Sequence, residues 1–184
     1  MKIKNYLQYI WLLFAAAMVG IDRLTKWLVV TNMKEKGTTI NLIKFGDTEV
    51  LNLYYCENNG AAWSTLSGKT ILLIVITSIV ILGLLFLMVT KRVKRPVYMA
   101  AVSLIIGGGI GNLIDRIFND GNVVDFIDFR IINFPIFNFA DICAVCGAGL
   151  LMIMVIVDEI RERKRKKQAA AKSPETVDGD DGKS

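Results

Sequence analysis

The sequence predicts a mainly α membrane protein, a four-transmembrane-helix bundle with both termini in the cytoplasm and a small extracytoplasmic β segment. Hydrophobic residues make up 53% of the 184 residues, and most of them gather in long runs with few or no charges. Short basic clusters separate these runs. The clusters all fall on one side of a membrane if the chain crosses it four times, and this agreement supports the number of spans.

Each long apolar run can cross a bilayer as a helix, because about 20 residues at about 1.5 Å per residue cover a hydrocarbon core of about 30 Å. Backbone polar groups in lipid must be satisfied internally, which favours helices over irregular chain. A cleavable signal peptide is an alternative for the first run, but three further spans make a retained helix the simpler interpretation. The expected helices cover residues 6–30, 70–90, 97–114 and 136–157.

The basic clusters set the expected orientation, because lysine and arginine gather in cytoplasmic segments. They precede the first helix, separate the second from the third at 91–95, and follow the fourth at 161–167. We expect one membrane-embedded domain over 1–160, and then a cytoplasmic tail over 161–184 that is basic over 161–167 and disordered over 168–184. For the basic part, attraction to membrane lipids or control of topology is favoured over nucleic-acid binding.

The longer extracytoplasmic segment is expected to form two or three short strands. Residues 38–56 are rich in β-branched and aromatic side chains, alternate in part, and contain a turn signal at Gly46-Asp47. An isolated hairpin is only marginally stable, so this β segment is expected to pack on the bundle or on the membrane surface.

The absence of histidine from the chain removes Ser-His and Cys-His catalysis from consideration. Cys143 and Cys146 share a helical face but lack the companions that a zinc site needs. No metal and no cofactor are therefore expected, and carboxylates are left as the candidate catalytic groups.

Ionisable side chains at membrane depth are costly, which makes them candidates for functional sites. Asp22 and Lys26 lie one helical turn apart and can form an ion pair that serves either helix packing or an active site. Arg23 points to another face and is expected to extend its charge to the membrane surface. Asn112, Asp115 and Arg116 share one face at the end of the third helix, where we expect an ordered polar network.

Two acidic residues lie on either side of the last extracytoplasmic loop segment. Asp125 is flanked by apolar residues, and Asp141 lies about one turn inside the fourth helix. Two carboxylates in a partly desolvated site repel each other when both are ionised, so the pair can hold one proton near neutral pH. Such a pair can activate water and polarise a carbonyl, as in aspartic proteases. From the residues alone, aspartyl hydrolysis, ion binding or transport, and a structural polar network all remain open.

Five motifs follow one another along the chain: DRLTK at 22–26, NNGAAW at 58–63, GGGIGNLIDR at 107–116, VVDF at 123–126 and FNFAD at 137–141. In this order, and on a four-span pattern, they resemble the bacterial lipoprotein signal peptidases, also called type II signal peptidases. The resemblance covers roughly residues 5–160. One departure is Trp63, which stands where this family usually has Phe.

The resemblance implies an aspartic endopeptidase of the bacterial plasma membrane with its active site at the outer face. Its substrates would be diacylglyceryl-modified prolipoproteins, cut just before the lipidated Cys, and membrane lipids would be its other partners. Asp125 and Asp141 would be the catalytic pair, and a monomer suffices because both lie in one chain. The implied substrate-binding or supporting residues are Asp22, Lys26, Asn58, Gly60, Gly108, Asn112, Asp115, Arg116 and Asn138.

Overall fold

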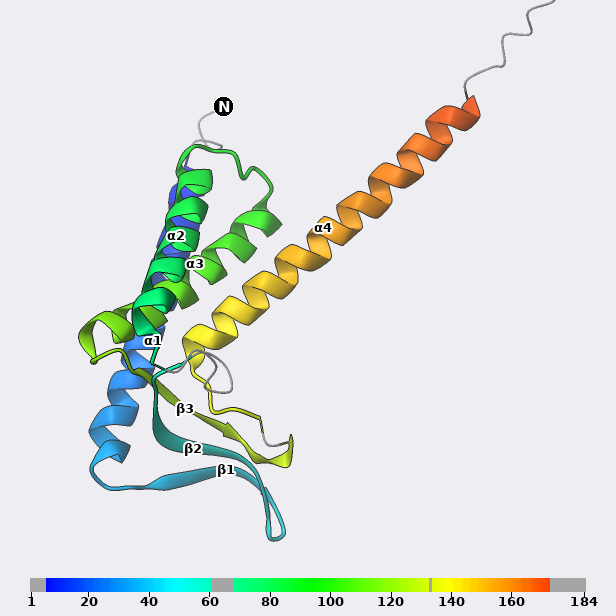
Figure 1. Cartoon of the computed structure of the whole chain (residues 1–184). Coiled ribbons are helices and arrows are strands. Elements are labelled where there is room, and N and C mark those ends of the chain that lie inside the picture. Colours follow the sequence, from blue (N-terminus) through cyan, green and yellow to red (C-terminus); the bar gives the residue numbers. More distant parts are fainter. Residues whose placement is uncertain (1–5, 61–67, 133, 173–184) are drawn as a thin grey trace, which may run out of the picture. The chain divides into compact units, whose positions relative to one another are not determined.

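The computed structural model describes residues 6–60, 68–132 and 134–172 (Figure 1). Within this part of the chain it contains four long α-helices and a three-stranded sheet. The chain divides into two compact units, residues 1–151 and 152–184. The first unit holds the sheet, helices α1 to α3 and the beginning of α4. The second holds the remainder of α4.

The helices account for most of the described chain. α1 covers Leu7–Val29 and continues as a short π-helix over Val30–Lys34. The others are α2 at Thr70–Val89, α3 at Pro96–Phe118 and α4 at Phe139–Lys172. Among the described residues, α2, α3 and α4 are the helices with the length and apolar composition needed to cross a membrane.

The sheet joins two segments that lie far apart in the sequence. β1 at Thr39–Phe45 and β2 at Thr48–Asn58 form the expected hairpin, and Gly46 adopts a φ of +58° in the turn between them. β3 at Val123–Phe129 pairs antiparallel with β2. The sequence prediction treated this stretch as a loop and missed the strand. Pairing with β2 gives it a fixed register, with Asp125 opposite Cys56.

Two apolar clusters hold the first unit together. One is buried between α1, α2 and α3 and includes Ala15, Ile81 and Ile106. The other packs Val29 and Met33, at the end of α1 and in the π-helix, against Val124 and Phe126 of β3. The second cluster therefore fixes the strand that carries Asp125 against the end of the first helix.

Glycines allow α3 to approach its neighbours closely. A Cβ at Gly107 would lie 3.0 Å from the carbonyl oxygen of Ala15 in α1. A Cβ at Gly108 would lie 2.9 Å from the backbone nitrogen of Ala144 in α4, and closer still to the carbonyl oxygen of Ala140. Such contacts are too short for any side chain, so these positions bring the backbones of α1, α3 and α4 together.

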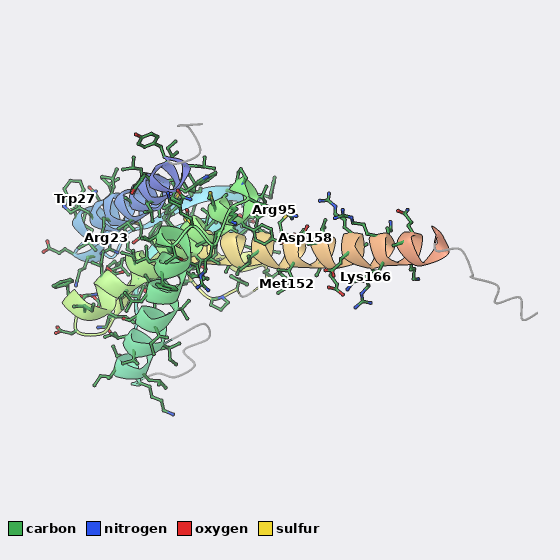
Figure 2. The ribbon with its side chains drawn as sticks, turned by 90° about the horizontal axis from the view of Figure 1, so that it is seen from above. Arg23, Trp27, Arg95, Met152, Asp158 and Lys166 are labelled. Atoms are coloured by element: carbon green, nitrogen blue, oxygen red, sulfur yellow. The ribbon has the colours of Figure 1, made fainter. Side chains whose placement is uncertain are left out.

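The second unit differs from its expected form. α4 runs to Lys172, so residues 168–172 are helical where a disordered tail was expected. Ion pairs from Arg163 to Glu159 and from Lys166 to Glu162 link successive turns, and helices are stabilised by such pairs. Met152, Asp158 and Lys166 follow one another along this part of the helix (Figure 2). The expected tail beyond 172, and residues 61–63 of the second motif, lie outside the described residues.

Candidate active site

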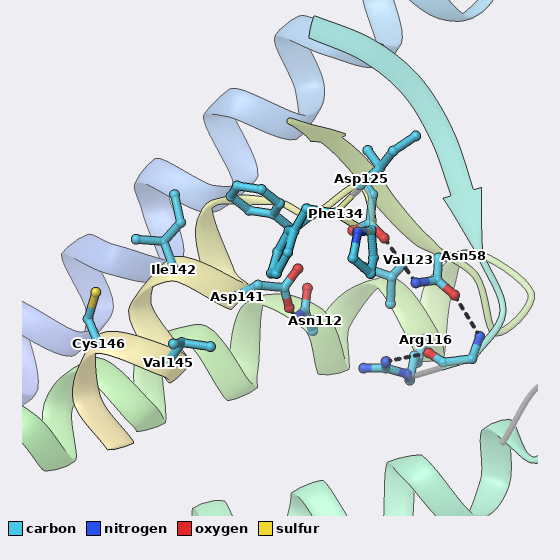
Figure 3. Close-up of a pocket in the computed structure, with 14 residues that line it drawn as sticks. Asn58, Asn112, Arg116, Val123, Asp125, Phe134, Asp141, Ile142, Val145 and Cys146 are labelled. Carbon is cyan, nitrogen blue, oxygen red and sulfur yellow. Dashed lines mark hydrogen bonds between the residues drawn. The ribbon is translucent and has the colours of Figure 1, made fainter. Parts of the chain in front are cut away.

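Asp125 and Asp141 line the same cavity, which has a volume of about 490 Å³ (Figure 3). One part of its wall is polar and comes from the end of β2 and the residues after it, from β3, from α3 and from Asp141 in α4. Another part is apolar and comes from the segment before α4 and from the first turns of α4. The polar lining includes Asn58, Gly60, Asn112 and Arg116, and the apolar lining includes Phe134, Phe137, Ile142 and Val145.

Asp125 is held by β3 and by amide donors on two sides. Its side chain is buried, with 3% of the residue exposed. Asn58 Nδ2 donates to Oδ2 at 3.1 Å, and Asn138 Nδ2 donates to Oδ1 at 2.7 Å. Burial and then the charge of Asp141 raise the pKa of Asp125 to about 7, against the opposing effect of these hydrogen bonds. Near neutral pH, Asp125 can therefore carry a proton.

Asp141 is fixed by a reciprocal cap at the start of α4. Asn138 Oδ1 accepts a hydrogen bond from the Asp141 backbone N–H at 2.9 Å, and Asp141 Oδ2 accepts one from the Asn138 backbone N–H at 3.1 Å. This is the pattern of a capping box, in which two side chains satisfy free N–H groups at a helix start. Asn112 Nδ2 also donates to Asp141 Oδ1 at 2.7 Å.

Asn138 links the two carboxylates. It is fully buried and belongs to the cap that orients Asp141, while its side-chain amide donates to Asp125. The same amide lies 3.0 Å from Asn112 Oδ1, which places both asparagines between the acids. A buried network whose members are all hydrogen-bonded is rigid, so the two carboxylates are set relative to each other.

A buried ionic cluster supports this arrangement from α1 and α3. Lys26 Nζ lies 3.1 Å from Asp22 Oδ2, 2.8 Å from Asp115 Oδ2 and 2.9 Å from Asn112 Oδ1. The predicted pair between Asp22 and Lys26 is therefore present. An ammonium group has three protons, and these three acceptors can use all of them.

The two acids of this cluster also accept hydrogen bonds from backbone beside the cavity carboxylates. Asp22 Oδ1 accepts from the N–H of Ala140, the residue before Asp141, at 3.1 Å. Asp115 Oδ2 accepts from the N–H of Val124, the residue before Asp125, at 3.2 Å.

Arg23 does not extend to the membrane surface as predicted. Its Nη1 lies 2.6 Å from Asp115 Oδ1, and its Nη2 lies 2.8 Å from Asp22 Oδ2 and 3.1 Å from the carbonyl oxygen of Gly111. At about 100° per residue, positions 22, 23 and 26 occupy about 100° of the helix surface. All three can therefore face α3, and this spacing could have indicated that Arg23 lies on the same side of the helix as Asp22 and Lys26.

The remaining predicted residues lie at or beside the cavity. Arg116 Nη2 donates to the carbonyl oxygen of Gly60 at 3.1 Å, and the Gly60 N–H donates to Asn58 Oδ1 at 2.9 Å. Arg116 and Asn58 thus hold the chain at Gly60, and Asn58 also reaches Asp125. Gly108 lies at the contact between α3 and α4, one turn before Asn112.

The structure thus brings the predicted residues together around one cavity. Asp125, Asp141, Asn58, Gly60, Asn112 and Arg116 line it, while Asp22, Lys26, Asp115 and Asn138 are buried beside these residues. Sequence reasoning missed Arg23 and the apolar wall. Chemically, two carboxylates with their orientations fixed can bind and activate a water molecule, and the apolar wall can accept a hydrophobic segment of a ligand.

Comparisons with known proteins assign a family to this arrangement. Residues 14–157 match the family described as signal peptidase (SPase) II. The lipoprotein signal peptidase of Halalkalibacterium halodurans is 42% identical over 159 residues, which cover 85% of this chain and 98% of that protein. The corresponding protein of Enterococcus faecalis is 36% identical over 162 residues, covering 85% and 94%.

Solved structures agree with the sequence comparisons. One bacterial membrane enzyme matches with a TM-score of 0.72 at 34% identity, covering 82% of this chain and 89% of that one. Another matches with a TM-score of 0.68 at 36% identity, covering 79% and 92%. With its apolar helices, the protein is a multi-pass membrane enzyme. The chain belongs to the signal peptidase II family and is a protease.

Proposed function

We propose that this protease removes the signal peptide from diacylglyceryl-modified prolipoproteins, cutting just before the lipidated Cys, with Asp125 and Asp141 as its catalytic pair. The observation that carries this proposal is the cavity that both carboxylates line, with the Asn138 side-chain amide donating to Asp125 and the Asn138 backbone N–H donating to Asp141. The names of the relatives support the substrate class.

The proposed reaction begins with one proton shared by the two acids. The raised pKa of Asp125 favours this residue as the protonated member, which donates a hydrogen bond to the oxygen of the scissile carbonyl. Asp141 then takes a proton from a water molecule, and the water oxygen attacks the carbonyl carbon. Asp125 gives its proton to the carbonyl oxygen, so a neutral tetrahedral diol forms.

The diol collapses by reversing these proton transfers. Asp141 gives its proton to the nitrogen of the lipidated Cys, and the bond between carbon and nitrogen breaks. Asp125 recovers a proton from one hydroxyl of the diol as the new carboxyl group forms. The products are a signal peptide with a free carboxyl end and a lipoprotein with a free amino group on its first residue.

The shape and polarity of the cavity support an apolar substrate. From Asp141, the lining continues along α4 through Ile142 and Val145, and Phe134 lies beside them (Figure 3). Lipid chains are about as apolar as this wall, so a signal helix or an acyl chain can pass from the bilayer to the wall without exposing apolar surface to water. The polar end of the cavity, with Asn58 and Arg116, is suited to the peptide carbonyls at the cut.

We further propose the membrane arrangement that the basic clusters predict. α1 would be the fourth span, both termini would lie in the cytoplasm, and the cavity would open at the outer face of the bacterial plasma membrane. The peptidase domain would cover 1–160 and the tail 161–184. A monomer would suffice, because the residues that line the cavity come from one chain.

A cleavage assay on purified protein tests this function. Two synthetic substrates are compared, one prolipoprotein segment with a diacylglyceryl-modified Cys and the same segment without the lipid. We expect the lipidated form alone to be cut efficiently, with product masses that place the cut before the Cys. Equal cutting of both forms, or a cut at another bond, would contradict the proposed substrate class.

A further inference from the structure

Two buried acids connect Arg23 to the catalytic carboxylates. Asp22 accepts a hydrogen bond from the backbone N–H of Ala140, and Asp115 accepts one from the backbone N–H of Val124. Each of these N–H groups belongs to the residue just before a cavity carboxylate. The separation between Asp22 and Asp115 therefore affects the separation between Asp141 and Asp125.

Arg23 bridges these two acids. Its Nη1 bonds to Asp115 at 2.6 Å and its Nη2 bonds to Asp22 at 2.8 Å. A guanidinium group is planar and rigid, so it sets the distance between two acceptors in a way that the single ammonium of Lys26 does not. The third bond of Arg23, to the carbonyl oxygen of Gly111, attaches the guanidinium to α3.

Arg23 also balances the charge of the cluster. Asp22 and Asp115 are both buried, and an unpaired buried charge is costly. With Lys26 and Arg23 present, two cations meet two anions. Without Arg23, Lys26 would be the single cation beside both carboxylates. Stronger pairing of Lys26 with these acids would then weaken its hydrogen bond to Asn112, which in turn donates to Asp141.

We propose that Arg23 is a positioning residue for the hydrolysis. It acts through Asp22 and Asp115 to hold the two catalytic carboxylates at the separation that catalysis requires. This inference rests on the proposed function, because it assigns a role in that same reaction. Arg23 lies on α1 four residues before Trp27 (Figure 2) and is not among the residues that line the cavity. Its role should therefore affect turnover rather than substrate binding.

The test compares kcat and KM of three variants on the lipidated substrate. Arg23→Met keeps the length of the side chain and removes its hydrogen bonds and charge, and Arg23→Lys restores the charge without the bidentate bridge. The control is Arg130→Met, because Arg130 also pairs with two acids, Glu49 and Asp128, but is exposed and does not line the cavity.

For Arg23→Met we expect kcat to fall on the order of 10-fold to 100-fold with KM changed less than about threefold, since small displacements of reacting groups have effects of this size. Arg23→Lys should recover part of the loss, and Arg130→Met should match the wild type. Normal kcat in Arg23→Met would overturn the proposal. A lowered melting temperature with normal kcat per folded molecule would also overturn it, because Arg23 would then contribute to stability alone.

A readout without substrate separates this inference from the proposed function. The infrared band of the protonated carboxyl that disappears in Asp125→Asn reports the surroundings of Asp125. If Arg23 positions the pair, this band shifts in Arg23→Met and stays in place in Arg130→Met. An unshifted band would overturn the inference. Failure of the wild type to cut the lipidated substrate would instead overturn the proposed function.

Discussion

The contact between α3 and α4 at Gly108 allows a test of how the position of Asp141 affects catalysis. Gly108 sets the distance between the two helices near Asp141 but does not line the cavity. In Gly108→Ala, the new Cβ would lie 2.9 Å from the nitrogen of Ala144 and closer still to the carbonyl oxygen of Ala140. Both neighbours are backbone atoms, which cannot turn aside as a side chain can. The start of α4 must therefore move away from α3.

The size of this movement sets the expected effect. Ordinary contacts begin at 3.4 Å, so the backbone of α4 must shift by at least about 0.5 Å at Ala144 and by more at Ala140. A misplacement of about 1 Å can cost about 100-fold in rate, so kcat should fall about 10-fold or more. Overpacking of this kind also costs about 1–3 kcal/mol of stability.

The assay measures kcat and melting temperature in detergent for Gly108→Ala beside two matched controls. Gly149 lies in α4 and Gly83 in α2, and a Cβ at either position would meet no atom within 4 Å. Alanine there should leave kcat unchanged and stabilise the helix by about 0.5–1 kcal/mol. A Gly108→Ala variant with the kcat and melting temperature of the controls would show that α4 does not shift.

Four further predictions concern the acids, their partners and metal ions. The cleavage rate should fall as pH rises through about 7, because the pKa of Asp125 is raised to about 7 and the pair then loses its shared proton; a pH–rate profile checks this. Because its pKa is raised, Asp125 binds its proton more tightly in the folded state than in the unfolded chain. The thermal stability of the wild type should therefore fall as pH rises from about 4 to about 7, and the stability of Asp125→Asn should not show this fall. Lys26→Met removes one of the two cations that pair with Asp22 and Asp115, and it should lower the free energy of unfolding by about 3–5 kcal/mol. An unchanged melting temperature would contradict this. Chelators should leave cleavage unaffected, since the proposed reaction uses no metal, and strong inhibition would argue against it.

Local patterns predicted the helices and the hairpin because both depend on nearby residues. Apolar runs of sufficient length favour helices in lipid, and the turn at Gly46-Asp47 closes β1 onto β2. The pair of Asp22 and Lys26 follows directly from helical spacing. The family resemblance named the residues around the cavity, and their roles in catalysis stay a prediction.

The missed features depend on contacts between distant segments. β3 becomes a strand through pairing with β2, although its content of β-branched and aromatic residues, VVDFIDF over 123–129, offered a weak signal. The direction of the Arg23 side chain depends on α3, where Asp115 and the carbonyl oxygen of Gly111 accept its hydrogen bonds. No pattern within one helix shows which neighbour it will pack against.

In the proposed reaction, Asp125 and Asp141 perform the hydrolysis together. The most direct test measures kcat on the lipidated substrate for Asp125→Asn and Asp141→Asn, with Asp128→Asn as the control. Asp128 lies on the same strand as Asp125 but pairs with Arg130 away from the cavity. The prediction is that each of the first two variants loses cleavage while keeping a cooperative melting transition, and that Asp128→Asn cuts at the wild-type rate. Substantial turnover by either Asp125→Asn or Asp141→Asn would contradict hydrolysis by this pair.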